Sequence, residues 1–135
     1  MAGSDVCVRR PPGGGLASVA TDHVRLSYHY LNVGDIDGYG SLFSEQAVLR
    51  GPQRELLCGR AELERFERCR QRTGRATHRV LDVVATGRVV VAIGCVEDGA
   101  DRADGPQSSD FVDVFVICDD GLIAERRTIH LVSTE

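Results

Sequence analysis

The sequence predicts a single α+β domain in which three N-terminal helices cover one face of a curved antiparallel sheet, forming a cone around one pocket. A length of 135 residues is typical of one domain. Apolar residues in the first half of the chain recur at intervals of three or four, which indicates helices. After Gly74 the chain changes to β-branched runs separated by turn residues, which indicates strands. Helices followed by strands favour an α+β layout.

The segment 1–15 is expected to be a flexible leader, followed by one domain over 16–135. In this segment Arg9-Arg10 precedes prolines and glycines, whereas a secretory signal has an apolar stretch of about 7–15 residues after its charges. No apolar run approaches the ~18 residues of a membrane span. We therefore expect a cytoplasmic protein with no membrane partner.

The first helix is predicted to begin at Leu16 and to end at Gly34. Its inward stripe follows helical spacing and consists of Leu16, Ala20, Val24, Ser27 or Tyr28, and Leu31. Asp35 is placed to cap a second, shorter helix. The inner face of that helix is predicted to carry Ile36, Tyr39, Leu42 and Phe43.

A brief strand is predicted at Ala47–Arg50, and a third helix near Gly59. The buried stripe of that helix is predicted to contain Leu63, Phe66 and Cys69. Glu64 and Arg68, four residues apart, are expected to form an exposed pair on the same helix.

The second half of the chain predicts a four-stranded antiparallel meander. Its strands are expected at His78–Ala85, Val89–Val96, Asp110–Cys118 and Ile123–Val132. A long polar loop over 97–109 joins the middle two strands, and Asp119-Asp120-Gly121 is a hairpin turn signal.

Composition excludes several classes of function. The 20 acidic and 16 basic residues give a net charge of −4, which disfavours nucleic acid as a partner. All of the basic residues are arginines, so the chain contains no Schiff-base or phosphate-loop lysine. The 5 cysteines are scattered without metal-ligand spacing and are expected to be reduced thiols. We expect no metal and no other cofactor.

Asp113 is the strongest candidate for chemistry on physical grounds. Alternation along its strand puts it on one face with Phe111 and Phe115. A carboxyl group between two phenyl rings is poorly solvated, so burial is expected to raise its pKa. Such a group can act as a general acid or donate a hydrogen bond to an oxyanion. An ion pair with Arg126 or Arg79 is the structural alternative, and it would lower the pKa instead.

His78 is a second candidate, because a pKa near neutrality suits proton transfer. Asp113 would orient its ring if the two side chains face each other. A satisfied core or rim histidine is the alternative.

A set of residues spanning about 19–132 carries a resemblance to a known family. These are Tyr28-x-Tyr30-Leu31-Asn32-Val33-Gly34-Asp35-Ile36, Leu42-Phe43, Ala47-x-Leu49, Gly51-Pro52, Gly59-Arg60 and Asp120-Gly121-x-Ile123. In this order the set resembles the nuclear transport factor 2-like superfamily, in its SnoaL-like or ketosteroid-isomerase-like branch. The resemblance implies a bent sheet and helices around one deep, mostly apolar pocket. It does not fix an activity, because members include isomerases, dehydratases, cyclases, hydrolases and binding modules.

Carried over position by position, the resemblance satisfies no catalytic template completely. The general-base Asp of ketosteroid isomerases falls at Gly51, and their oxyanion-binding Tyr falls at Ser27, beside Tyr28. Their second oxyanion-binding group, a carboxylic acid, falls on Asp113, which is retained.

Other branches are matched only in part. The His of the scytalone and bile-acid dehydratases falls on His78, while their helix-one Asp falls at Asn32. The acidic residue on the last strand of SnoaL-type cyclases falls at Thr128. The resemblance also implies that Arg126, Thr128 and His130, which share one strand face, look into the pocket; a solvated rim is the alternative for Arg126.

We therefore expect a cofactor-independent acid–base enzyme, a dehydratase, isomerase or cyclase, acting on a hydrophobic small molecule of secondary metabolism such as a polyketide or terpenoid. Asp113 and His78 are the predicted catalytic residues. The predicted substrate-binding residues are Ser27, Tyr28, Asn32, Phe111, Phe115, Arg126, Thr128 and His130. The alternatives are a non-catalytic binding protein and an association module.

A homodimer is expected from the outer face of the sheet. Val112, Val114 and Val116 point away from the pocket, as does part of 89–91. Helices cover only one face of such a sheet, so the other apolar face needs a partner, and a two-fold pair is the commonest solution.

Overall fold

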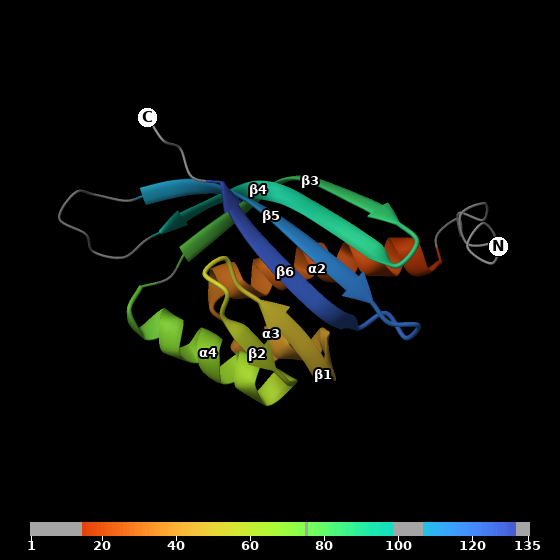
Figure 1. Cartoon of the computed structure of the whole chain (residues 1–135), viewed down its shortest axis with the longest axis horizontal. Coiled ribbons are helices and arrows are strands. Elements are labelled where there is room, and N and C mark those ends of the chain that lie inside the picture. The colour runs from red at the N-terminus through yellow and green to blue at the C-terminus, as the bar shows by residue number, and fades with distance from the viewer. Residues whose placement is uncertain (1–14, 75, 99–106, 132–135) are drawn as a thin grey trace.

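The computed structural model describes residues 15–74, 76–98 and 107–131. The leader predicted at 1–15 lies outside these ranges except for its last residue. The helices are α2 (Leu16–Val33), α3 (Ile36–Ser41) and α4 (Arg60–Arg72). The strands are β1 (Phe43–Arg50), β2 (Leu56–Cys58), β3 (Ala76–Thr86), β4 (Val89–Asp98), β5 (Gln107–Ile117) and β6 (Ile123–Leu131). The predicted α+β class, with helices on one side of a curved sheet, is confirmed (Figure 1).

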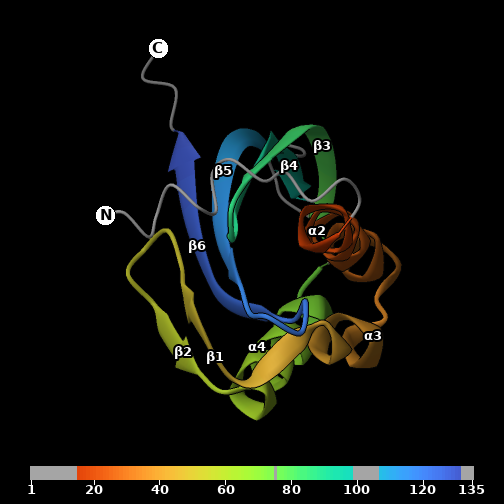
Figure 2. The ribbon, with the colours of Figure 1, turned by 90° about the vertical axis from the view of Figure 1, so that its right-hand side faces the viewer.

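The sheet is larger than the sequence predicts. Its 6 strands follow the order β2-β1-β6-β5-β4-β3. The predicted antiparallel meander is confirmed for β3 to β6. The correction concerns β1, which joins the meander by parallel pairing with β6, and β2, which extends the sheet beyond it. In Figure 2 the sheet curls around an interior, with α2 beside β3 and α4 beside β1 and β2.

The first strand begins earlier than predicted. Phe43, which the sequence places on the inner face of the second helix, is the first residue of β1. It pairs with Ile123 of β6, and the amide of Ile123 donates to the carbonyl of Leu42 at 2.9 Å. This pairing joins residues 80 positions apart, so local periodicity carries no signal for it.

The predicted loop over 97–109 is also shorter at both ends. β4 continues to Asp98, and β5 already begins at Gln107, where Asp98 and Gln107 are cross-strand partners. The part of the loop at 99–106 lies outside the described residues.

The predicted face of α2 is confirmed. Its fully enclosed side chains are Ala20, Val24, Ser27, Tyr28 and Leu31. Gly34 ends the helix with a φ of 82°, a left-handed conformation that glycine adopts without a steric penalty. Asp35 then caps α3 by accepting a hydrogen bond from the Gly38 amide at 2.9 Å.

α4 presents a different face from the predicted one. Leu63 is buried and Phe66 is half-buried, as expected, but Cys69 is exposed. The buried residue on the next turn is Glu67, which lies four positions after Leu63. A residue four positions along a helix lies on the same face as the first, so the helix turns a carboxylate inward.

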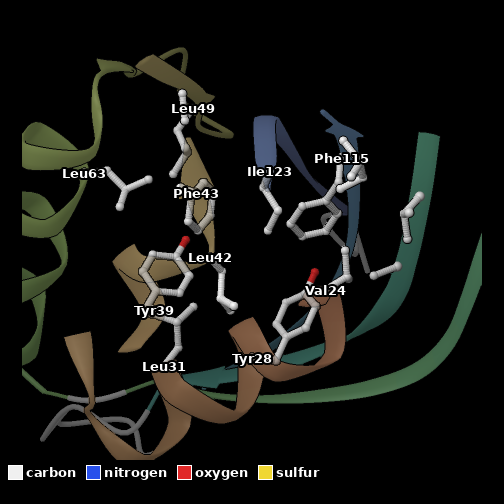
Figure 3. Close-up of a cluster of buried hydrophobic side chains, with 14 of the residues drawn as sticks. Val24, Tyr28, Leu31, Tyr39, Leu42, Phe43, Leu49, Leu63, Phe115 and Ile123 are labelled. Atoms are coloured by element: carbon white, nitrogen blue, oxygen red, sulfur yellow. The ribbon is translucent and has the colours of Figure 1, made fainter. Parts of the chain in front are cut away.

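The hydrophobic core lies between the helices and the sheet. Figure 3 shows Val24, Phe43, Phe115 and Ile123 packed between α2 and the sheet. In the same view Tyr28 and Tyr39 direct their hydroxyl groups away from their helices and toward the sheet. Both tyrosines are buried, so both hydroxyl groups need polar partners inside the protein.

Candidate active site

The register of β5 and β6 brings the predicted polar residues to one face. Asp113 lies directly opposite Thr128, and Phe115 lies opposite Arg126. His130 lies opposite Phe111. Because side chains two positions apart on a strand share a face, Arg126 becomes a diagonal neighbour of Asp113.

Asp113 forms the centre of a buried polar network. Its side chain is 0% exposed. Its Oδ2 atom accepts a hydrogen bond from the Tyr28 hydroxyl at 2.5 Å and another from Arg126 Nη2 at 2.8 Å. Its Oδ1 atom is buried with no hydrogen-bond partner among the described residues. The predicted inward, shielded position of Asp113 is therefore confirmed.

The ion pair decides the charge of Asp113. Burial alone raises its pKa, but the adjacent Arg126 guanidinium and the hydrogen bonds lower it more, so the pKa lies below its usual value. The expectation that burial between Phe111 and Phe115 raises the pKa is corrected, and the ion-pair alternative with Arg126 is the one the structure contains. Asp113 is ionised at neutral pH and has no proton to donate.

Arg126 is held on several sides. Its Nη1 donates to the Tyr39 hydroxyl at 2.6 Å, while its Nη2 bonds Asp113. Its guanidinium carbon also lies 5.5 Å from the centre of the Tyr28 ring and 5.6 Å from that of Phe115. Burial by itself lowers the pKa of Arg126, but Asp113 raises it well above its usual range, so the positive charge is permanent.

His78 is fixed through its backbone. The Asn32 side chain accepts from the His78 amide at 2.8 Å and donates to the His78 carbonyl at 2.9 Å, which ties β3 to α2. The imidazole Nδ1 is buried without a hydrogen-bond partner among the described residues. Burial and the nearby Arg126 charge lower the pKa of His78 to about 3. The expectation of a pKa near neutrality is therefore wrong, and the ring is neutral at physiological pH.

The predicted pair of Asp113 and His78 is linked through a third residue. The Tyr28 ring lies 5.6 Å from the His78 ring, and its hydroxyl contacts Asp113. His78 Nδ1 makes no bond to the carboxylate. Orientation of the imidazole by Asp113 would thus act through packing against Tyr28.

A cavity of about 280 Å³ opens beside this network. It is lined by Leu31, Leu49, Arg50, Gly51, Pro52, Gln53, Glu55, Leu57, Phe66, Glu67, Arg70, His78, Val96, Arg126, Thr128 and His130. Side chains with polar ends outnumber the apolar ones, which corrects the mostly apolar pocket that the resemblance implied. The lining is suited to a small molecule that has an apolar frame and oxygen atoms.

The predicted site residues divide into three groups. His78, Arg126, Thr128 and His130 line the cavity. Asp113, Tyr28, Phe111 and Phe115 lie behind that wall, fully buried. Ser27 and Asn32 use their side chains on backbone groups, Ser27 by donating to the Val24 carbonyl at 2.6 Å. Direct contact between a substrate and the last two groups stays a prediction.

Two carboxylates that line the cavity, Glu67 and Glu55, are not among the residues predicted from the sequence. The available signal for Glu67 was its helical spacing from Leu63. Glu55 lies on the turn between β1 and β2, and its carboxylate occupies the space that a side chain at Gly51 would fill. The cavity therefore holds a carboxylate beside the position where ketosteroid isomerases have theirs, although residue 51 itself has no side chain.

The fold agrees with the comparison against family models. Residues 24–126 match the model of the SnoaL-like domain. The chain belongs to this family, as the sequence resemblance predicted. A comparison with curated proteins finds no match.

Solved structures show the same fold at low identity. A candidate polyketide cyclase of Xanthomonas campestris pv. campestris is 21% identical, with a TM-score of 0.77 over 87% of this chain and 93% of that chain. An LEH-like epoxide hydrolase of M. tuberculosis is 16% identical, with a TM-score of 0.77 over 85% and 84%. SalBIII, an epoxide hydrolase/cyclase-like enzyme with a role in pyran ring formation in salinomycin, is 20% identical, with a TM-score of 0.76 over 85% and 92%.

Two further observations concern cofactors and membranes. Within residues 15–74, 76–98 and 107–131, no group of three or more His, Cys, Asp or Glu side chains is arranged to hold a metal ion. The absence of a cofactor stays a prediction. None of the described helices has the length and apolar character needed to cross a membrane.

Proposed function

We propose that this chain is a cofactor-independent acid–base enzyme that acts on a small carbonyl compound with a largely apolar frame. Membership in a family with cyclases, isomerases and epoxide hydrolases among its structural neighbours supports an enzyme. The names of two neighbours, which refer to polyketide and polyether chemistry, support a substrate from secondary metabolism. The candidate reactions are dehydration, isomerisation and ring closure.

The observation that carries this proposal is the position of Arg126. It is a buried cation that lines the cavity and is held by Asp113, Tyr39 and two aromatic rings. An arginine has five N–H donors, and these bonds use two of them. A fixed and largely buried cation stabilises negative charge that develops on a substrate oxygen, and it needs no reorganisation during the reaction.

The other predicted residues receive supporting roles in this proposal. Asp113 and Tyr28 position Arg126. The Asp113 carboxylate pairs with its positive charge, and the Tyr28 ring packs against its guanidinium group. His78 offers a neutral imidazole on the cavity wall, which forms a hydrogen bond with a substrate hydroxyl group. A pKa of about 3 makes His78 a poor carrier of protons at neutral pH.

Binding of an enolate analogue tests the role of Arg126. The probe is 2-hydroxy-1,4-naphthoquinone, a planar and readily ionised enol, titrated by calorimetry. Replacing Arg126 alone would leave Asp113 as an unpaired buried charge, so the variant is the double replacement Arg126→Met with Asp113→Leu. We expect the double variant to bind the probe at least about 10-fold more weakly than wild type.

The control is Arg127→Gln, which changes an exposed arginine on the opposite face of β6. This variant is expected to bind the probe like wild type. Equal affinities for wild type and the double variant would contradict the proposed role of Arg126.

A binding protein without turnover is the second candidate function, favoured by Asp113, which is ionised and carries no proton to give. A pH profile of turnover separates the two candidates. The turnover rate of an enzyme changes with pH as a catalytic group gains or loses its proton. A binding protein gives no rate above that of the uncatalysed reaction.

We propose that a second copy of the chain covers the convex face of the sheet and forms a homodimer. Ile93, Val112 and Ile129 are consecutive cross-strand partners there, and Val84, Val91 and Val114 form a parallel row. Ile93 is 41% exposed and Ile129 is 45% exposed. Light scattering at micromolar concentration is expected to give a dimer, and Ile93→Glu a monomer; a wild-type monomer would contradict this.

A further inference from the structure

We infer that Glu67 is the catalytic base of the cavity, and that the substrate carries an acidic C–H bond next to a carbonyl group. This inference rests on the proposed function, because it needs Arg126 to receive the carbonyl oxygen. Glu67 comes from the helical wall of the cavity on α4, whereas Arg126 comes from the strand wall on β6.

Glu67 is buried, yet its carboxylate has only a long contact with a neighbouring arginine. The residue is 5% exposed, and it lines the cavity. Its Oε1 atom approaches Arg70 Nε at 3.9 Å, which is beyond hydrogen-bond range, and the Arg70 side chain is 46% exposed. The carboxylate is thereby shielded from water while its lone pairs stay available to a ligand.

Glu67 is also electrostatically coupled to the oxyanion-binding group. Burial raises the pKa of Tyr39, Asp113 raises that of Arg126 against the effect of burial, and the charge of Glu67 adds to both. A base and a cation that face the same cavity from two walls match the two ends of an enolisable ketone, where a proton leaves carbon and charge arrives on oxygen.

The other acid–base groups of the cavity fit this role less well. Asp113 is ion-paired with Arg126, accepts a second hydrogen bond from Tyr28, and does not line the cavity. His78 has its pKa lowered to about 3 by burial and Arg126, so it binds a proton poorly. Glu55 accepts a hydrogen bond at 2.7 Å from the Gln53 amide, in an exposed turn.

The proposed step balances without an oxidant or a reductant. Glu67 takes the proton from the carbon beside the carbonyl group. The electron pair of the C–H bond forms a C=C bond, and the C=O pair moves to the oxygen on Arg126. The proton on Glu67 then goes to another carbon in an isomerisation, or to a departing hydroxyl group in a dehydration.

The test uses 5-nitrobenzisoxazole, a generic probe for a carboxylate base in a protein cavity. Removal of its C3 proton breaks the N–O bond and forms a nitrile and a phenolate, which is followed by absorbance. We expect the wild-type protein to catalyse this elimination and Glu67→Gln to lower the rate by about 10²-fold. Glu67→Ala is expected to recover part of the rate when acetate is added.

Glutamine variants of two other glutamates show whether the loss of rate comes from removing the base or from changing the net charge. Glu64 lies on the same helix, contacts Arg68 at 3.6 Å and does not line the cavity, so Glu64→Gln is expected to keep the wild-type rate. Glu55→Gln changes the second cavity carboxylate. A loss with Glu55→Gln and none with Glu67→Gln would overturn the inference, as would wild-type protein no faster than free acetate.

The elimination assay tests Glu67 and the naphthoquinone titration tests Arg126, so either result can be negative without the other. Glu67→Gln is expected to bind 2-hydroxy-1,4-naphthoquinone at least as tightly as wild type, because the bound probe is an anion and the variant removes a negative charge. If Arg126 governs probe binding but Glu67→Gln leaves the elimination unchanged, the proposed function stands and the role of Glu67 is wrong.

Discussion

Two buried carboxylates, Asp113 and Glu67, lie in neighbouring regions of one interior but in opposite chemical surroundings. Asp113 lies behind the cavity wall, where Tyr28 and Arg126 both donate to its Oδ2 atom. Glu67 reaches the cavity, where its nearest cation is 3.9 Å away. The difference shows that burial alone does not identify a proton carrier. The number of donors that already engage the carboxylate is the better guide.

The first carboxylate contributes to structure and the second is available for chemistry. A carboxylate with two strong donors is held ionised, so it can fix an arginine but cannot exchange protons near neutrality. A carboxylate with weak partners costs stability through desolvation, and a catalytic site is a place where such a cost is tolerated. The four predictions that follow test this contrast.

The largest expected effect is on stability, from Asp113→Asn. Removing the charge leaves Arg126 buried without its counter-ion, so we expect the free energy of unfolding to fall by about 3–5 kcal/mol. Glu67→Gln is expected to change it by less than about 1 kcal/mol, because no short bond is lost. Urea denaturation at pH 7 measures both, and equal losses would remove the contrast between the two carboxylates.

Acid pH is expected to destabilise the protein through His78. Its pKa is about 3 in the folded protein, from burial and Arg126, and about 6.5 when unfolded. Between these values the unfolded chain binds more protons, so stability falls as the pH falls. The expected loss from pH 6.5 to pH 4 is about 2–4 kcal/mol. His78→Asn should flatten this slope.

The Tyr28 hydroxyl is expected to matter less than the ion pair. Tyr28→Phe removes one hydrogen bond to a charged group, so we expect a loss of about 1.5–3 kcal/mol in the free energy of unfolding. A double-mutant cycle of Tyr28→Phe with Asp113→Asn is expected to show a strong coupling, since the two side chains share one bond. Additive effects would mean that this hydrogen bond contributes nothing.

The smallest effect is expected from a partly exposed carboxylate on the same helix as Glu67. Glu64→Gln removes an ion pair with Arg68 that spans one helical turn at 3.6 Å. Water and salt screen such pairs, so the expected loss is about 0.3–0.5 kcal/mol. Thermal unfolding at low and high salt checks this value, which should vanish at high salt.

The sequence predicted the position of Asp113 but not its partners. Strict alternation along 110–117 determines which face each residue occupies, and the observed register agrees. The ion pair with Arg126 depends on how β5 and β6 align, and turn residues alone do not specify that alignment. The sequence alone therefore does not decide whether burial raises the pKa of Asp113 or pairing with Arg126 lowers it.

Glu67 was missed for a different reason. The predicted stripe on α4 was continued along apolar residues to Cys69, although 63, 66 and 67 lie on one side of a helix. The charged residue on this stripe, Glu67, marks the point where the helix borders the cavity. The parallel pairing of β1 with β6 was missed because it joins distant segments, and no local pattern encodes it.

The titration of the Asp113 carboxyl group tests the central claim most directly. Carbon-13 NMR of protein labelled at aspartate carboxyl groups, assigned with Asp113→Asn, follows its protonation. Because Arg126 lowers the pKa more than burial raises it, we expect Asp113 to remain ionised until the pH falls below its ordinary value of about 3.9. An Asp113 carboxyl group that takes up its proton above about pH 5 would contradict the account and would restore this residue as a general acid.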